Sequence, residues 1–172
     1  AKSEKPIFAS DEKGHISAIY GKYKQHAINK NRMPTVIVEE DAELARRMKD
    51  KFLEKLNSQA KKLAEPPLVQ FYNGIEYAVY QYDKAQGIYL PQVTKSYDTV
   101  ELLETEIKKQ GGVENTITIT TPMMGRGTDF KPVDKNGKTH PDGLFVIGAY
   151  AEASEREERQ IVGRMGRQGQ NG

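Results

Sequence analysis

The chain of 172 residues contains no cysteine and no long apolar run. Without cysteine it has no disulfide bond, no thiol nucleophile and no thiolate metal site, which is compatible with a reducing cytoplasm. No apolar segment approaches the ~20 residues needed to span a bilayer, so we expect the chain not to be an integral membrane protein. Residues 1–10 show no secretion signal, and a first residue other than Met suggests an excised piece or a processed product.

A strong excess of charge of either sign is also absent, since the formal net charge is +2. A domain that tracks nucleic acid is usually strongly basic, so the charge balance argues against nucleic acid as a partner. Charged residues make up 29% of the chain and hydrophobic residues 37%, as in an ordinary soluble globular protein. The length fits one domain with its own core.

The sequence lacks a phosphate-binding P-loop, which requires a Gly, four residues and then Gly-Lys-Ser/Thr. Residues 136–139, Asn-Gly-Lys-Thr, come nearest, but Pro132 occupies the position of the first Gly and no strand directly precedes it. His15, His26 and His140 share no metal-ligand spacing, so we predict surface histidines and no metal site.

Hydrophobic periodicity predicts alternating helices and strands. The expected helices cover residues 12–28, 41–61 and 99–109, and a further helix is expected after Ser154, which can cap it. The expected strands cover 35–38, 68–72, 116–120 and 144–147. Short apolar strands that alternate with amphipathic helices predict an α/β sandwich with a mostly parallel sheet. Residues 66–98 contain the turn signals Asn73-Gly74 and Gln86-Gly87, which favour an irregular or hairpin insertion.

Three acidic residues, Glu39, Glu40 and Asp41, directly follow the first expected strand. They could form a magnesium-binding strand end. They could instead begin the following helix, where acidic side chains complement the positive end of the helix dipole. We favour the second interpretation.

Two stretches combine glycine with arginine in an unusual way. Residues 122–130 read P-M-M-G-R-G-T-D-F just after an expected strand, where ligands bind in doubly wound folds. Residues 160–172 read Q-I-V-G-R-M-G-R-Q-G-Q-N-G, with Arg164 and Arg167 three residues apart. Glycines have no Cβ and so allow a ligand to approach the backbone closely, and the planar guanidinium groups of arginine match phosphate oxygens. For the second stretch the alternative is a disordered Arg/Gly tail that binds nucleic acid loosely or has no function.

These stretches provide cationic groups without the loop that would hold a nucleotide in the same chain. Phosphoryl transfer depends on positioning and on cations that stabilise charge on the γ-phosphate, and an arginine supplied from outside the primary site can contribute ~10³–10⁵ in rate. The sequence therefore predicts half of an active site, and we expect the isolated chain to be inactive.

Several motifs together resemble the SecA preprotein-translocase ATPases. Thr121-Pro-Met-Met-Gly-Arg-Gly-Thr-Asp129-Phe130 resembles the A-T-N-M-A-G-R-G-T-D-I stretch of that family, and residues 160–172 resemble Q-L-R-G-R-S-G-R-Q-G-D-P-G. Residues 143–148, G-L-F-V-I-G, resemble G-L-H-V-I-G at the same distance upstream, and residues 33–38 resemble a P-V-L-V strand. The strong match covers the last third of the chain.

The resemblance implies that residues 1–172 are a single RecA-like domain, a three-layer sandwich of the helicase C-terminal type, acting as the second motor domain. ATP with Mg²⁺ would lie in a cleft and be held mainly by an N-terminal P-loop ATPase domain. Arg167 and Arg126 would contact the terminal phosphate, and Arg164 would support the phosphates or couple the domains. The remaining implied nucleotide-site residues are Gly125, Gly127, Thr128, Asp129, Gln160, Gly163 and Gly166.

The resemblance also implies a polypeptide substrate, a membrane channel as partner, and a cytoplasmic location with peripheral attachment at the inner face of the membrane. Pro122 stands where the family has Asn, and residues 150–152 replace its Glu-Arg-His. A proline removes a backbone donor beside the phosphate site, so the change puts ATPase chemistry in question. Two alternatives remain: a superfamily-two helicase motor, and a regulatory module that has lost its chemistry.

Overall fold

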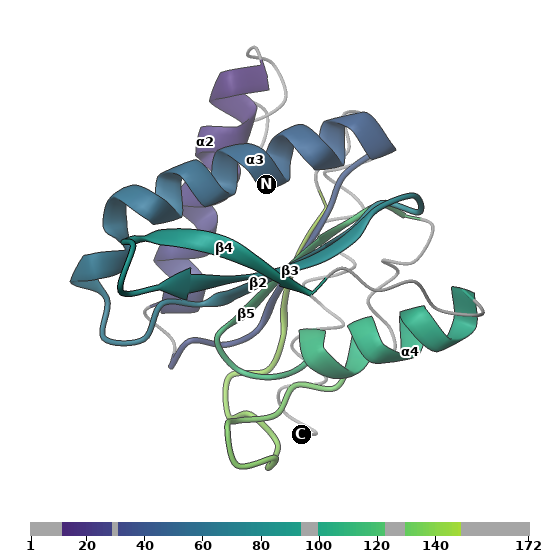
Figure 1. Cartoon of the computed structure of the whole chain (residues 1–172). Coiled ribbons are helices and arrows are strands. Elements are labelled where there is room, and N and C mark those ends of the chain that lie inside the picture. The colour runs from purple at the N-terminus through teal and green to yellow at the C-terminus, as the bar shows by residue number, and fades with distance from the viewer. Residues whose placement is uncertain (1–11, 29–30, 94–99, 123–129, 149–172) are drawn as a thin grey trace.

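The computed structural model describes residues 12–28, 31–93, 100–122 and 130–148. They form a six-stranded sheet with helices on both faces, which confirms the predicted α/β class and is consistent with a RecA-like fold (Figure 1). The helices are α2 (Glu12–Tyr23), continued by a π-helical turn over Lys24–Ile28, α3 (Ala42–Gln59), continued by a 3₁₀ turn over Ala60–Lys62, and α4 (Val100–Gly111). The strands are β1 (Thr35–Val38), β2 (Leu68–Tyr72), β3 (Tyr77–Asp83), β4 (Ile88–Val93), β5 (Thr116–Thr120) and β6 (Phe145–Gly148).

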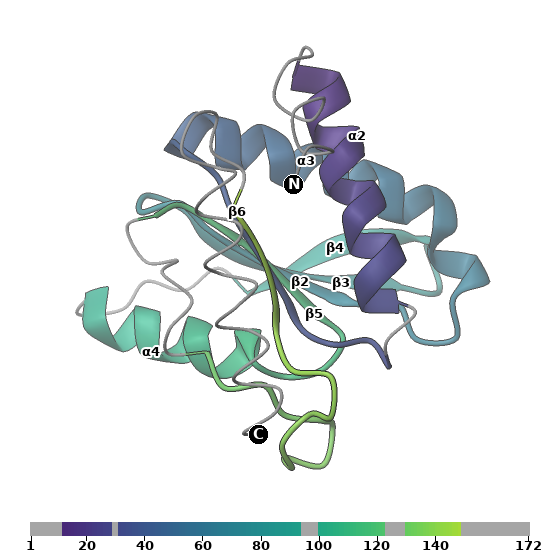
Figure 2. The same ribbon diagram turned by 180° about the vertical axis from the view of Figure 1, so that it is seen from behind.

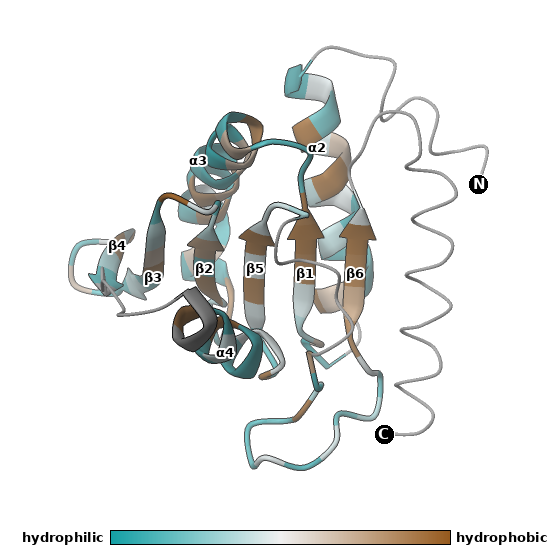
Figure 3. Cartoon of the chain, turned by 90° about the vertical axis from the view of Figure 1, so that its right-hand side faces the viewer, coloured by the Kyte–Doolittle hydropathy of each residue, from teal (hydrophilic) through white to brown (hydrophobic). Residues whose placement is uncertain are grey.

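The strand order is β4-β3-β2-β5-β1-β6, and β2, β5, β1 and β6 run parallel. Their carboxyl ends therefore meet at one edge of the sheet, seen at the arrowheads in Figure 3. The strands β1, β5 and β6 are buried along their whole length, as expected of parallel strands covered on both faces. This arrangement places the end of β5, after which the first Gly-Arg stretch begins in the sequence, beside the end of β1.

Two separate clusters of buried side chains hold the three layers together. The larger cluster joins α2 and α3 to the sheet through the aromatic rings of Tyr20, Tyr23 and Phe52, with the Tyr20 and Phe52 centroids 5.0 Å apart. The smaller cluster joins α4 to the opposite face through Ile107 and Phe130. Figures 1 and 2 show the same division, with α2 and α3 on one side of the sheet and α4 on the other.

Strand β5 shows how one short sequence serves both faces. Ile117 and Ile119 enter the cluster under α2 and α3. The hydroxyl of Thr118 accepts a hydrogen bond from Gln70 Nε2, which also donates to the carbonyl oxygen of Ile107 in α4. Alternation of side chains along a strand therefore directs isoleucine to one face and threonine to the other.

Residues 66–98, where we expected an irregular or hairpin insertion, begin with β2 of the parallel sheet. They continue through β3 and β4, which extend the sheet by two antiparallel strands. Gly74 and Gly87 occupy the connecting turns with φ of 93° and 75°, values that L side chains rarely adopt. Pro91 lies in the edge strand β4, where a missing backbone donor is tolerated.

Candidate functional site at the carboxyl edge of the parallel strands

The structure fixes the two ends of the first Gly-Arg stretch. Thr121, directly after β5, is buried, and Pro122 is exposed. The described chain resumes at the fully buried Phe130, whose ring packs so closely on Gly111 that a Cβ there would lie 2.4 Å from it. The stretch therefore starts at the carboxyl edge of the sheet and is followed by a residue anchored in the α4 cluster.

The predicted site residues lie outside the described residues. This applies to Gly125, Arg126, Gly127, Thr128 and Asp129 in the first stretch, and to Gln160, Gly163, Arg164, Gly166 and Arg167 in the second. The expected helix after Ser154 lies outside them as well. Their roles stay predictions, and the described part of the site is the sheet edge itself.

Glu39 is the main feature of this edge that the sequence analysis missed. It follows β1, its backbone N–H donates to the carbonyl oxygen of Thr120 at 2.8 Å, and its side chain is fully buried. Its Oε2 lies 3.2 Å from Nε2 of His15 in α2. Burial raises the pKa of the Glu39 carboxyl, and the neighbouring His15 opposes that rise in part. A helix distant in sequence thus holds one oxygen of a buried acid.

Three oxygen atoms at this edge have no hydrogen-bond partner among the described residues: Oε1 of Glu39 and the hydroxyl oxygens of Thr120 and Thr121. Val38 pairs with Thr120 in the parallel ladder, so Glu39 and Thr121 follow at neighbouring positions. A buried acceptor without a partner costs about 1–3 kcal/mol. The edge therefore has unused hydrogen-bonding groups: a carboxyl oxygen that accepts and two hydroxyl groups that can accept or donate.

The acidic cluster divides between two functions. Asp41 caps α3, because its Oδ1 accepts a hydrogen bond from the Leu44 N–H at 2.8 Å, and this confirms the predicted helix start. Glu40 is exposed. Glu39 departs from the favoured interpretation, since it pairs with His15 and does not belong to the first turn of the helix. In the part of the chain that the structure describes, no group of three His, Asp or Glu side chains could hold a metal ion.

The prediction of surface histidines is wrong for two of the three residues. His15 is buried against Glu39. His140 is fully buried, with its Nε2 3.1 Å from the Asn31 carbonyl oxygen and its Nδ1 accepting from the Asp142 N–H at 3.0 Å. His26 is half-buried and lies against the ring of Phe145, with centroids 4.9 Å apart. Spacing along the chain could not reveal these contacts, because their partners are distant in sequence.

The Asn-Gly-Lys-Thr segment is a turn, in agreement with its rejection as a P-loop. Asp134 Oδ1 accepts hydrogen bonds from the backbone N–H groups of Asn136 and Lys138. The turn precedes β6, at the amino end of the strands and away from the edge that carries Glu39 (Figure 3).

Comparison with known proteins relates part of this chain to translocase subunits. It is 45% identical over 69 residues to protein translocase subunit SecA 1 of Chlorobium chlorochromatii, which is 40% of this chain and 7% of that protein. It is 46% identical over 70 residues to the SecA subunit of Mycoplasmopsis synoviae, covering 41% and 6% of the two chains. For the SecA subunit of Porphyromonas gingivalis strain W83 the identity is 47% over 72 residues, covering 40% and 6%.

The matched region is thus less than a tenth of the length of these relatives. No protein-family profile matches the chain, and no solved structure matches it. Within the described residues, no helix combines the length and apolar character that crossing a bilayer requires. About two fifths of this chain is therefore a region related to SecA protein-translocase subunits.

Proposed function

We propose that this chain is the second RecA-like domain of a SecA-like motor that drives polypeptide translocation by ATP hydrolysis. The observation that carries the proposal is the point at which the chain leaves β5. Thr121 and Pro122 directly follow this strand, which has parallel neighbours on both sides, at the edge where doubly wound sheets bind ligands. Residues 125–127, Gly-Arg-Gly, come next in the sequence. The SecA-related region supports the same class of motor.

In this proposal Arg126 and Arg167 contact the terminal phosphate of ATP and Arg164 supports it. A P-loop domain outside this chain holds the nucleotide and its Mg²⁺. The chemistry that the metal supplies is neutralisation of charge on the β- and γ-phosphates. The described edge contributes hydrogen-bonding side chains to this proposal, and within the described residues no group of three His, Asp or Glu could hold a metal ion.

Glu39 has a role suited to this edge. An ionised carboxylate would repel phosphate, but burial raises the Glu39 pKa and so favours its neutral form. Its unpaired Oε1 and the neighbouring Thr121 hydroxyl oxygen can each accept a hydrogen bond, for example from a guanidinium or from a sugar hydroxyl. We infer that these groups position a donor beside the nucleotide, and that the phosphate contacts belong to arginine.

The experiment is substitution of Arg167 in the full-length protein. Arg167→Ala should lower kcat for ATP hydrolysis at least ~10²-fold, because the transition state loses a cation, while ATP still binds. Steady-state ATPase assays and titration with a fluorescent ATP analogue measure the two effects separately. Arg47→Ala is the matched control, since Arg47 is exposed and paired with Glu12 on the outer face of α3. An unchanged kcat for Arg167→Ala would remove the arginine from catalysis.

A further inference from the structure

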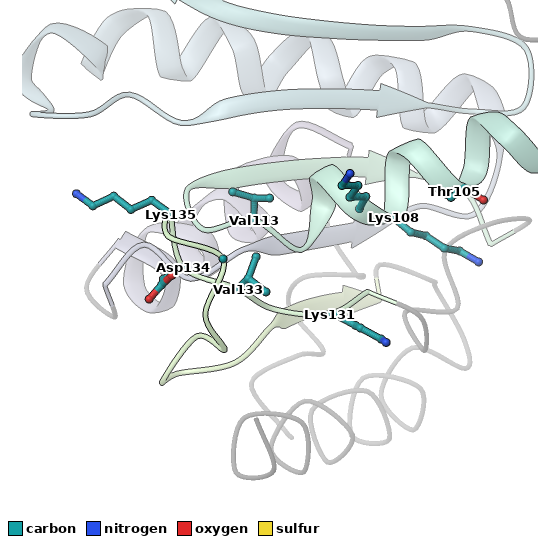
Figure 4. A pocket seen from close by; sticks show the side chains of 9 residues that line it. Thr105, Lys108, Val113, Lys131, Val133, Asp134 and Lys135 are labelled. Carbon is teal, nitrogen blue, oxygen red and sulfur yellow. The ribbon is translucent and has the colours of Figure 1, made fainter.

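A groove of about 680 Å³ lies between the last turns of α4 and residues 131–137, outside the site described above. Four lysines line it: Lys108 and Lys109 from α4, and Lys131 and Lys135 from the facing segment. In Figure 4 Lys131 and Lys135 lie toward opposite ends of the groove, with Val113 and Val133 between them. We call it the lysine groove.

The two walls of the lysine groove are fixed to each other. A Cβ on Gly112 would lie 2.1 Å from the carbonyl oxygen of Lys131, so only glycine permits this approach of the two backbones. The Val133 N–H donates to the Gly112 carbonyl oxygen at 2.7 Å, and the Glu114 N–H donates to the Val133 carbonyl oxygen at 2.8 Å. The backbone segments that carry the lysines are therefore held in place by contacts within the chain itself.

The charge of the groove is strongly positive although the chain as a whole is near balance. Asp134 is the one carboxylate among the lining residues, and its Oδ1 already accepts the N–H groups of Asn136 and Lys138. These hydrogen bonds lower the pKa of Asp134. Lys109, Lys131 and Lys135 are exposed, and none of them is in an ion pair with a described residue.

The floor of the groove distinguishes between classes of anionic partner. Val113 and Val133 provide a recessed apolar surface, and the lining includes no aromatic side chain on which a nucleobase could stack. A flat bilayer cannot reach a recessed floor, and the exposed large apolar side chains of the described residues, Ile75 and Ile88, lie elsewhere, in or next to the turns that flank β3. A peptide can place carboxylates on the rim and one apolar side chain on the floor.

We propose that the lysine groove binds a short acidic segment of a partner polypeptide, which inserts one apolar side chain between Val113 and Val133. The acidic residues pair with the lysines on both walls. The groove lies on the α4 side of the sheet, near the amino ends of its parallel strands, so peptide binding is separate from the nucleotide edge and does not depend on the function proposed for it.

The test uses the intact protein and the fluorescein-labelled peptide Glu-Glu-Asp-Leu-Glu-Glu, with binding followed by fluorescence anisotropy at low salt. We expect saturable binding that weakens as salt is added, because exposed charge pairs are screened. The double variant Lys131→Glu/Lys135→Glu should weaken binding at least tenfold. The control Lys51→Glu/Lys61→Glu makes the same charge change at exposed positions of α3 and the turn after it, and should bind as the wild type does.

Replacing the peptide Leu by Ser tests the apolar floor and should also weaken binding several-fold. If the peptide binds equally to both double variants, the groove is not the site and the proposal fails. It also fails if a single-stranded oligonucleotide or an anionic vesicle binds more tightly than the peptide with the same dependence on Lys131 and Lys135. Circular dichroism of every variant shows whether the variant is folded. The variant Lys131→Gln/Lys135→Gln removes the two positive charges without introducing negative ones, and together these measurements separate lost binding from lost folding.

Discussion

Glu39 combines two features that are costly to a fold: a fully buried carboxyl group and an oxygen without a hydrogen-bond partner among the described residues. His15 in α2 satisfies the other oxygen, and the negative charge of Asp41 adds to the effect of burial on the pKa. A leucine of similar volume would avoid these costs. Their presence at the carboxyl edge of the sheet, where doubly wound folds bind ligands, is the strongest residue-scale argument for a function there.

The raised pKa of Glu39 predicts a specific dependence of stability on pH. Between the ordinary value of 4.5 and the raised value, the folded chain keeps a proton that the unfolded chain releases. The unfolded state therefore binds fewer protons, and the free energy of unfolding falls as pH rises through this window.

We expect this fall to disappear in Glu39→Gln, which is neutral at every pH. Urea unfolding followed at several pH values between 4 and 8 measures the difference between the two proteins. Glu40→Gln is the control, because Glu40 is exposed, and it should keep the fall seen in the wild type. If the wild type and Glu39→Gln differ by the same free energy at every pH, Glu39 does not hold a proton in the folded chain.

At the scale of helices and strands, local pattern predicted which segments form and roughly where they begin and end. The apolar stripe through Met48, Phe52 and Leu56 corresponds to the buried face of α3. The pattern did not predict that Lys49 lies on this face, with its ammonium 5.1 Å from the centroid of the Phe71 ring and 5.4 Å from that of Tyr80. Those rings belong to β2 and β3, so the contact depends on strand pairing.

The order of the strands could not be predicted from the sequence either, because it too depends on pairing between segments that are distant in the chain. Nothing local indicates that β5 lies between β1 and β2, yet this order places Thr121 next to Glu39. The sequence therefore predicted a site at the edge after β5, and it named Glu39 only as part of an acidic cluster. It could not predict that Glu39 lies next to Thr121 or that it pairs with His15 of α2. The roles of Arg126, Arg164 and Arg167 stay predictions, because these residues lie outside the described part of the chain.

Glycines in and after helices show that one residue type can have opposite effects on stability. Gly112, just after α4, lies against the Lys131 backbone, so Gly112→Ala should destabilise the fold by about 1–3 kcal/mol through overpacking. Gly21 lies inside α2 in open space, where an added Cβ would meet no neighbouring element within 4 Å, so Gly21→Ala should stabilise the fold by about 1 kcal/mol. Thermal unfolding should show a lower Tm for Gly112→Ala and a higher Tm for Gly21→Ala. A raised Tm for Gly112→Ala would contradict the packing at Gly112.

At the scale of the whole molecule, the described surface has two candidate sites at opposite ends of the sheet. The carboxyl edge carries the buried oxygen atoms of Glu39, Thr120 and Thr121 that have no hydrogen-bond partner among the described residues, and the other end carries the lysine groove. The formal net charge of +2 does not reveal the positive groove, because acidic residues elsewhere in the chain balance its lysines. The nucleotide and the peptide that we propose as ligands would therefore bind to different residues and would not compete with each other.

The division of the nucleotide site between domains gives the last prediction. The purified chain should hydrolyse no ATP above background, since it contains no P-loop to bind the phosphates and Mg²⁺. The same residues within the full-length protein should support turnover that depends on Arg126 and Arg167. Phosphate release measured for both proteins under identical conditions tests this, with circular dichroism to show that the isolated chain is folded. Robust turnover by the isolated chain would mean that it holds a complete site, and the proposal that it only supplies arginines to a neighbouring domain would fail.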